Sequence, residues 1–340
     1  MTSDKKVRVK LIHRGSAANE DNPFKNQTPG SLGIWGNCEF TFNPLSDQYD
    51  WLVIIDDVAK LIPNRIENLK CPKENTILVT TEPSSITRYG RAFAKQFHYL
   101  ITNQEASILP HPNALRSHTG NIWMYGEDYD TMKQILPMKK TKKISTICSN
   151  KQQGHTGHKR RFIFTQVLEK EIAELRRFGR GFKWIDKKSE ALDDYEFHVC
   201  IENHIGKNVW TEKLADAFLG YTVPIYCGCP NIYDYFPKDS LIQIDSTDIK
   251  GSIKKIKKII TNSGEYNKRL EAVKEARRRV LDEYNLLAMI DKIVTNAKHV
   301  EFQPNKKIYS RRIMRIRYIP DLFRYFGFRI KNFLKNKLAF

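Results

Sequence analysis

The chain has 340 residues, of which 41% are hydrophobic and 28% charged, and its formal net charge is +19. This length suits two domains of ordinary size, and the apolar content excludes a disordered chain. No run approaches the roughly 20 apolar residues that a membrane-spanning helix needs, and no apolar run follows the basic start, so we expect a body that folds in the cytoplasm.

The six cysteines do not indicate a metal site or a disulfide framework. Only Cys227 and Cys229 are close together, and no second Cys or His pair stands at zinc-finger spacing. Cys200 and Cys227 lie in apolar runs, and the other cysteines are Cys38, Cys71 and Cys148. We expect all six to be reduced and no metal to be held by the protein.

The first half of the chain predicts strands that alternate with loops and helices. Residues 7–12 form a first strand, and the Gly-, Asn- and Pro-rich segment 15–44 predicts a long surface loop region. Residues 51–55, 76–80 and 98–102 are apolar runs typical of buried parallel strands. Because no tight hairpin signals separate them, they indicate a parallel α/β sheet, which we assign to a first domain of residues 1–138.

A basic stretch, residues 139–143, breaks this pattern and predicts a linker. The second domain, residues 144–300, then repeats the α/β alternation. Its expected strands are 144–148, 195–201, 223–226 and 241–244, and its expected helices are 159–177, 211–219 and a long helical region over 248–298. Two such sheets joined by a linker predict a ligand cleft at the carboxyl ends of the strands.

Residues 301–340 predict a basic amphipathic tail. From residue 306 onward eleven basic residues stand against one acid, Asp321, so this segment carries +10 of the +19. Large apolar side chains are interleaved with them at helical spacing, which is typical of a helix in an anionic lipid interface. The bulky aliphatic residues favour an anionic membrane surface over nucleic acid as the partner of residues 306–340. The alternative is a last helix packed on the rest of the protein.

The stretch from 197 to 237 carries the most chemistry. An apolar strand delivers Glu202 and Asn203 at its end, and Thr211, Glu212 and Lys213 stand at the head of a helix. A helix N-terminus and a lysine suit phosphate groups, and a carboxylate suits sugar hydroxyls. The alternative is a solvated helix cap without a ligand.

This stretch resembles the signature of glycosyltransferase family 10, the α1,3/4-fucosyltransferases, in its bacterial type. There a strand ending in Phe-Glu-Asn precedes Tyr-Val-Thr-Glu-Lys, an apolar helix and Val-Pro-Val-x-x-Gly-x-Pro-Asn. The corresponding segments here are IEN at 201–203, VWTEK at 209–213 and VPIYCGCPN at 223–231. The resemblance implies a GT-B fold, in which two Rossmann-like domains face a central cleft and the second binds the nucleotide sugar.

The resemblance extends upstream and implies roles for further residues. It assigns donor binding to Ser149, Asn150 and Arg161, with Arg160 as the rival of Arg161, beside Glu202, Asn203, Glu212 and Lys213. The turn FGRG at 178–181 matches a family turn that we interpret as structural.

The resemblance also suggests the catalytic base, in the acceptor-side first domain. Inverting transfer needs a carboxylate that takes the proton of the acceptor hydroxyl. Glu82 ends an apolar strand and matches a family turn that carries the proposed base. Asp56 and Asp57 end a neighbouring strand and compete for this role, but we interpret them as capping or solvated acids.

The implied activity is a fucosyltransferase, a hexosyltransferase that moves L-fucose from GDP-fucose to a hydroxyl of a glycan. The expected acceptor contains N-acetylglucosamine, in lipopolysaccharide or another surface polysaccharide, and Arg161 and Lys213 would neutralise the diphosphate without a metal cofactor. The family has Tyr where Val209 stands, so another GDP-hexose is an alternative donor, with Asn208 and Trp210 as candidates for compensation. A catalytically inactive glycan- or nucleotide-binding relative is a further alternative. The expected location is the inner face of the cell membrane, where the protein is peripheral.

Overall fold

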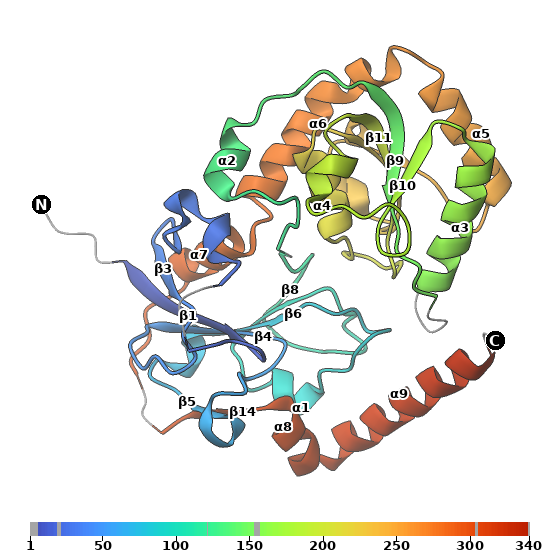
Figure 1. Ribbon diagram of the computed structural model, residues 1–340. Coiled ribbons are helices and arrows are strands. Elements are labelled where there is room, and N and C mark those ends of the chain that lie inside the picture. Colours follow the sequence, from blue (N-terminus) through green and yellow to red (C-terminus); the bar gives the residue numbers. More distant parts are fainter. Residues whose placement is uncertain (1–5, 19–21, 121, 153–156, 303–304, 339–340) are drawn as a thin grey trace, which may run out of the picture. The chain divides into compact units, whose positions relative to one another are not determined.

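The computed structural model describes residues 6–18, 22–120, 122–152, 157–302 and 305–338, which form two compact units (Figure 1). The first unit comprises Met1–Ile122, Asp128–Asp130 and Asn285–Asn332. The second comprises Trp123–Glu127, Thr131–Tyr284 and Phe333–Phe340. Each unit is an α/β layer structure with its own sheet, as the sequence predicts.

The sheet of the first unit has the strand order β2-β3-β1-β4-β6-β7-β8, and only the pair β2–β3 is antiparallel. All five side chains of each central strand, β4 and β6, are buried, because helices and loops cover both faces of the sheet. The predicted strands are therefore confirmed. The bounds are β1 (Val7–His13), β2 (Ile34–Trp35), β3 (Cys38–Thr41), β4 (Trp51–Ile55), β6 (Thr76–Thr80), β7 (Tyr99–Thr102) and β8 (Ala114–Arg116).

The predicted loop region 15–44 is only partly a loop, because it contains β2 and β3. Strand β3 pairs in parallel with β1, with Val7 opposite Cys38. Its side chains alternate between buried and more exposed, and Cys38 and Phe40 enter the core. This two-residue alternation is short and lies between glycines and asparagines, so composition hides it.

Helix α7 (Leu286–Asn296) belongs to the first unit, which corrects the predicted domain boundary at residue 300. Leu286, Leu287 and Ile290 join the core on one face of the first sheet. Asn285 caps the helix through its side-chain oxygen and donates from Nδ2 to the carbonyl of Gln27 at 2.8 Å. The apolar face of α7 thus completes the first core, although the helical pattern that precedes it builds the second unit.

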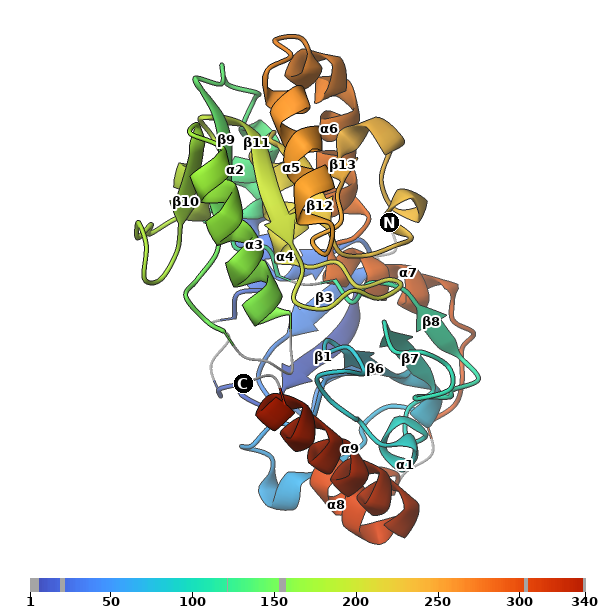
Figure 2. The same cartoon turned by 90° about the vertical axis from the view of Figure 1, so that its right-hand side faces the viewer.

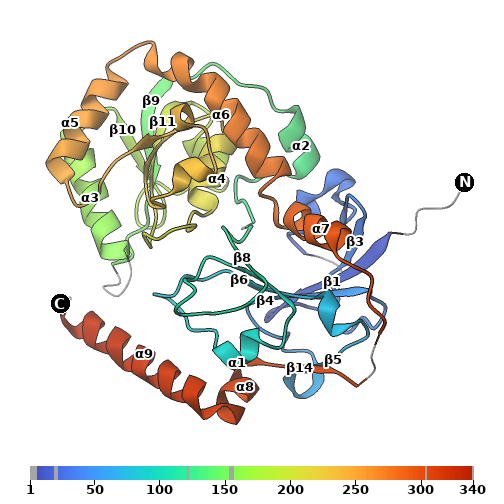
Figure 3. The same ribbon diagram turned by 180° about the vertical axis from the view of Figure 1, so that it is seen from behind.

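The start of the predicted tail is an integral part of the first unit. Strand β14 (Lys307–Tyr309) pairs with β5 (Ile66–Asn68) in a small antiparallel sheet, and Ile308 is buried in the core on the second face of the large sheet. Helix α8 (Arg311–Arg317) packs against α1 (Arg91–Ala94), and α9 (Ile319–Leu338) follows it (Figure 3). The prediction of a separate tail from residue 301 is therefore wrong for this segment.

Helix α9 has two opposite faces. Its inner face contacts the first unit: Asp321 accepts from the backbone amide of Ala92, and the Arg88 guanidinium lies 5.1 Å from the Phe328 ring centre. An exposed apolar row recurs at helical spacing on the other face. Its members are Ile319, Phe323, Phe326, Ile330, Phe333 and Leu334.

The second unit contains a five-stranded, all-parallel sheet in the order β10-β9-β11-β12-β13. Helices α3 and α5 lie on one face and α4 and α6 on the other (Figures 1 and 2). The strands are β9 (Lys142–Ile147), β10 (Leu175–Phe178), β11 (Tyr195–Ile201), β12 (Val223–Cys227) and β13 (Ile242–Gln243). The helices are α2 (Tyr129–Gln134), which begins in the first unit, α3 (His158–Glu171), α4 (Glu212–Leu219), α5 (Ile249–Ile260) and α6 (Glu265–Asp282).

Two predictions need correction here. The helix expected over 159–177 ends at Glu171, and β10 occupies the last part of that range. The expected linker 139–143 is built into the second unit, because β9 begins at Lys142. Lys140 donates to the carbonyls of Leu192, Asp193 and Gly220, and burial lowers its pKa to about 8.

All six cysteines are free and buried in the structure. Within the described ranges, no helix combines the length and the apolar character that crossing a membrane requires.

Candidate nucleotide-binding site

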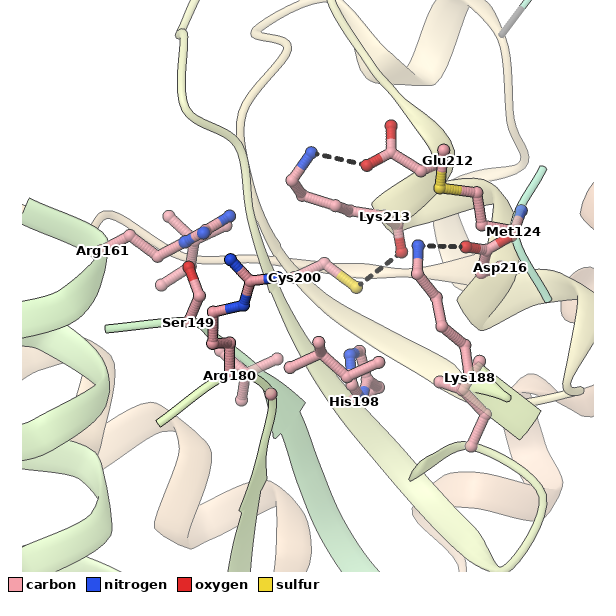
Figure 4. A pocket seen from close by; sticks show the side chains of 15 residues that line it. Met124, Ser149, Arg161, Arg180, Lys188, His198, Cys200, Glu212, Lys213 and Asp216 are labelled. Atoms are coloured by element: carbon pink, nitrogen blue, oxygen red, sulfur yellow. Dashed lines mark hydrogen bonds and ion pairs between the residues drawn. The ribbon is translucent and has the colours of Figure 1, made fainter. Parts of the chain in front are cut away.

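A pocket of about 260 Å³ opens in the second unit, along β11 and beside the start of α4 (Figure 4). Four cationic side chains line it, and they come from four separate segments: Arg161, Arg180, Lys188 and Lys213. Two carboxylates, those of Glu212 and Asp216, line it as well. With all six groups ionised the lining carries two net positive charges, which suits an anionic ligand.

Glu202, at the end of β11, fixes the start of α4 through hydrogen bonds to its N-cap residue, Thr211. The Glu202 carboxylate accepts from the backbone amide of Thr211 at 2.9 Å and from its hydroxyl at 2.8 Å. The Thr211 hydroxyl in turn caps the helix by accepting from the amide of Lys213. Glu202 is 1% exposed and does not line the pocket, so the structure places it beneath the site rather than in it.

Lys213 links two carboxylates at the pocket wall. Its Nζ lies 3.0 Å from Glu212 Oε1 and 3.6 Å from Glu202 Oε2. Burial alone would lower the pKa of Lys213, but these carboxylates outweigh it and raise the pKa. Burial alone would raise the pKa of Glu212, but the positive charges of Lys213 and Lys188 outweigh it and lower the pKa. Both groups are therefore held in their charged forms at neutral pH.

Arg161 supplies a buried, unsatisfied donor to the same pocket. The residue is 8% exposed, on the first turn of α3, and its Nε has no hydrogen-bond partner among the described residues. Arg160, its rival from the sequence, does not line the pocket. Ser149 follows β9 and lines the pocket beside Arg161 (Figure 4). A buried guanidinium without an acceptor favours a ligand that brings oxygen atoms to it.

The turn at 178–181, which we interpreted as structural, contributes Arg180 to the pocket. Gly179 and Gly181 both have positive φ, 121° and 86°. A Cβ on Gly181 would lie 2.7 Å from Nδ2 of Asn150, so glycine lets this turn approach the end of β9. The backbone of this turn is thus structural, and its arginine side chain lines the pocket.

The far end of the pocket carries an ion pair that the sequence did not reveal. Lys188 Nζ lies 2.6 Å from Asp216 Oδ2, and Oδ1 of Asp216 accepts from the amide of Met124. Burial raises the pKa of Asp216 to about 6. His198 lies on the floor, with Nδ1 2.6 Å from the hydroxyl of Ser145, and burial lowers its pKa to about 3.

Several sequence-predicted residues lie outside the lining. The carbonyl of Asn203 accepts from Gly157, and Asn150 is exposed behind the glycine turn. Val209 is buried, and Trp210 packs edge-on against Phe236 in an aromatic cluster. Asn208 bonds to Asn231 and Tyr235, so neither neighbour of Val209 takes the place of a tyrosine in the pocket.

Glu82 follows β6 in the first unit and is exposed. Its backbone is fixed on both sides, because its amide donates to Tyr89 Oη at 3.0 Å and its carbonyl accepts from Gln104 Nε2 at 2.9 Å. Tyr89 Oη donates to Asp56, which also accepts from the amide and hydroxyl of Thr81.

The competing acids of the first unit thus have structural partners. Asp56 holds the turn that carries Glu82, as described above. Asp57 accepts from Arg65 at 2.8 Å and from the backbone amide of Arg311 at 2.9 Å. No cluster of three metal-ligating side chains occurs in the part of the chain that the structure describes.

Residues 137–311, which are 175 of the 340, match the family model described as glycosyltransferase family 10 (fucosyltransferase) C-term. Alpha-(1,3)-fucosyltransferase FucT from Helicobacter pylori is 35% identical over 83 residues, which are 24% of this chain and 17% of that protein. Human 4-galactosyl-N-acetylglucosaminide 3-alpha-L-fucosyltransferase 9 is 29% identical over 216 residues, which are 62% of this chain and 56% of that protein. The matched part of the chain thus spans 17% of the length of the Helicobacter pylori protein and 56% of the length of the human one.

Among solved structures, an alpha1,3-fucosyltransferase with GDP-fucose superposes with a TM-score of 0.52 at 17% identity, covering 89% of this chain and 95% of that one. The same comparison with an alpha1,3-fucosyltransferase with GDP gives a TM-score of 0.51. This likeness shows the fold, which is of the GT-B type, with one mainly parallel and one all-parallel α/β sheet. Because the family model spans more than half of the sequence, the chain belongs to glycosyltransferase family 10, the fucosyltransferases.

Proposed function

We propose that this protein transfers L-fucose from GDP-fucose to a hydroxyl of a glycan, with inversion at the sugar carbon. The observation that carries the proposal is the pocket of the second unit, where four cations surround a helix N-terminus in a chain of this family. Arg161 and Lys213 bind the diphosphate, and Arg180 adds a third positive charge. Glu212 accepts hydrogen bonds from the ribose hydroxyls.

Charge neutralisation is the main catalytic contribution of this pocket. As the bond between fucose and diphosphate breaks, negative charge grows on the leaving phosphate, and preformed cations stabilise it without reorganisation. Arg161 suits this role because its planar fork matches phosphate oxygens and its Nε has no partner among the described residues. We expect a chelator to leave GDP binding unchanged, since these side chains supply the positive charge.

Glu82 is the proposed general base. It would accept the proton of the acceptor hydroxyl while that oxygen attacks the fucosyl carbon and GDP leaves. Its support is the fixed backbone of its turn, the exposure of its side chain, and the structural engagement of Asp56 and Asp57. The acceptor is a surface glycan that contains N-acetylglucosamine, such as lipopolysaccharide, at the inner face of the cell membrane.

We also propose that α9 attaches the protein to an anionic membrane surface. Its exposed apolar row lies opposite the face that contacts the first unit, and basic residues such as Lys331 flank this row. Amphipathic helices of this kind bind through apolar burial and through attraction to anionic lipids.

One observation favours a GDP-hexose other than GDP-fucose as an alternative donor substrate. Val209 is buried where the family has a tyrosine at the donor site, and its neighbours are engaged elsewhere. The sugar part of the donor therefore has one polar partner fewer, and another GDP-hexose is the alternative substrate.

The deciding experiment measures donor hydrolysis and transfer with GDP-fucose, GDP-mannose and GDP-colitose. We expect GDP-fucose to give the highest kcat/KM, with release of GDP. A preference for another GDP-hexose would support the alternative donor, and binding of GDP without turnover of any donor would indicate an inactive relative. If GDP did not bind at all, the assignment of the pocket would be wrong.

A further inference from the structure

A second cationic pocket lies in the first unit, between the α8–α9 pair and the segment around Gly90. Arg88, Arg91, Arg315 and Arg324 line it, against a single acid, Asp321. The carboxylate of Asp321 is already used, because Oδ1 accepts from Arg324 at 3.0 Å and Oδ2 accepts from the amide of Ala92 at 2.8 Å. The lining residues therefore carry three net positive charges.

The arginines that surround this pocket lack acceptors for several of their donors. Arg88 Nη1 and Arg91 Nε are buried and have no hydrogen-bond partner among the described residues. The side chain of Arg315 donates no hydrogen bond within the described part of the chain, and its guanidinium lies 3.6 Å from the ring centre of Tyr325. Burial lowers the pKa of both Arg88 and Arg315. The neighbouring Arg311 lowers the pKa of Arg315 further.

Arginine cannot relieve this situation by losing its proton, because the guanidinium group stays protonated in proteins. Each buried donor without an acceptor destabilises the folded protein, and like charges at close range add to that cost. One anion with several oxygen atoms would remove both costs. Phosphate fits best, since it carries up to two charges and offers paired oxygens to planar guanidinium groups.

We propose that the arginine pocket formed by Arg88, Arg91, Arg315 and Arg324 binds a phosphate group. The group belongs either to a soluble phosphate compound or to the headgroup of an anionic lipid. This site is separate from the donor pocket, which lies wholly in the second unit, and does not rest on the proposed transfer activity.

The first test titrates inorganic phosphate into the full-length protein by calorimetry, at constant ionic strength and with GDP added to occupy the donor pocket. The variants are Arg88→Met and Arg315→Met, and Arg329→Met is the control, since it removes an exposed α9 arginine outside the pocket. Loss of a charge-assisted hydrogen bond weakens affinity about 10- to 100-fold. We expect this loss in Arg88→Met and Arg315→Met, and wild-type affinity in Arg329→Met.

The second test measures flotation with phosphatidate vesicles and with phosphatidylcholine vesicles. If the phosphate is that of a lipid, Arg315→Met lowers binding to phosphatidate more than Arg329→Met does, although both remove one charge. If the source is soluble, only the calorimetric difference appears. Equal behaviour of Arg315→Met, Arg88→Met and Arg329→Met in both tests would overturn the proposal. Thermal melting without phosphate checks folding, and Arg315→Met should melt no lower than the wild type because it removes an unpaired charge.

Discussion

Replacing Lys213 by Met tests both the stability and the ligand of the donor pocket. In the native protein Nζ of Lys213 lies 3.0 Å from the carboxylate of Glu212 and 3.6 Å from that of Glu202, which is 1% exposed. The variant leaves two carboxylates without their cation. Breaking a buried ion pair typically costs about 3–5 kcal/mol. Because the Lys213 side chain is 23% exposed, we expect a loss of about 2–3 kcal/mol in the free energy of unfolding at pH 8.

The loss should depend on pH in a defined direction. Burial raises the pKa of Glu202 even with Lys213 present, and the variant removes the opposing charge. A carboxyl group whose folded pKa is raised contributes stability below its unfolded pKa, and this contribution is lost as the pH rises through the folded pKa. The difference between Lys213→Met and the wild type should therefore be smaller at pH 5 than at pH 8.

Urea unfolding at the two pH values measures this difference, and calorimetry with GDP measures the ligand. We expect GDP affinity to fall about 10- to 100-fold, as one charge-assisted contact is lost. Lys207→Met is the matched control, because Lys207 is an exposed lysine in the loop before α4. Wild-type stability of Lys213→Met at pH 8 would refute the electrostatic reasoning. Wild-type affinity for GDP would refute the placement of the diphosphate.

Three further predictions concern the first unit and the pocket floor. Glu82→Gln should lower kcat about 10²- to 10⁴-fold with GDP affinity unchanged. Glu105→Gln is the control, because Glu105 is an exposed acid of the same unit, and it should leave kcat and GDP affinity unchanged. A fully active Glu82→Gln would exclude Glu82 as the base. Ile308→Ala should lower the free energy of unfolding by about 2–4 kcal/mol in urea, because Ile308 is buried in the core; a change below about 0.5 kcal/mol would show that β14 is not needed for stability. His198 has a pKa of about 3 in the folded state, so the wild-type protein loses stability below pH 6.5, where the unfolded chain takes up a proton at this histidine. In His198→Asn the free energy of unfolding should therefore fall less steeply between pH 6.5 and pH 4. An unchanged pH dependence in urea titrations would contradict this.

The sequence was most informative where a pattern is local. The apolar runs at 51–55 and 76–80 coincide with β4 and β6, because buried parallel strands need continuous apolar residues. The helix start at Thr211 was also readable, since a capping hydroxyl and the following charges are adjacent in the chain. Local signals thus located Glu212 and Lys213, two of the residues that line the pocket.

The remaining site residues could not be found in this way. Arg161 and Arg160 are neighbours in sequence, and only the helix phase in the fold decides which of them faces the pocket. Lys188 and Asp216 form their ion pair across 28 positions, without a motif that joins them. Glu202 matches a family motif, but only its burial beneath Thr211 shows that it supports the helix cap.

The same limit applies to the division of the chain into units. Helix α7 continues a helical pattern that begins in the second unit, and nothing in its own sequence states which core it completes. Strand β14 has three residues, too few for a periodic signal, and the basic residues around it dominate the composition. Long-range packing therefore decided both assignments.

The interrupted first unit has a consequence for folding during synthesis. Nearly all of the second unit is one stretch, Thr131–Tyr284, whereas the first unit needs Asn285–Asn332 to complete its core. On the ribosome, more than 150 further residues are translated after the strands of the first sheet before α7 is made. During this interval the face of the sheet that α7 later covers is open to solvent. At about 5–20 residues per second this interval lasts roughly 8–30 seconds. Chaperone binding is therefore most useful to this protein between the emergence of β7 and that of α7.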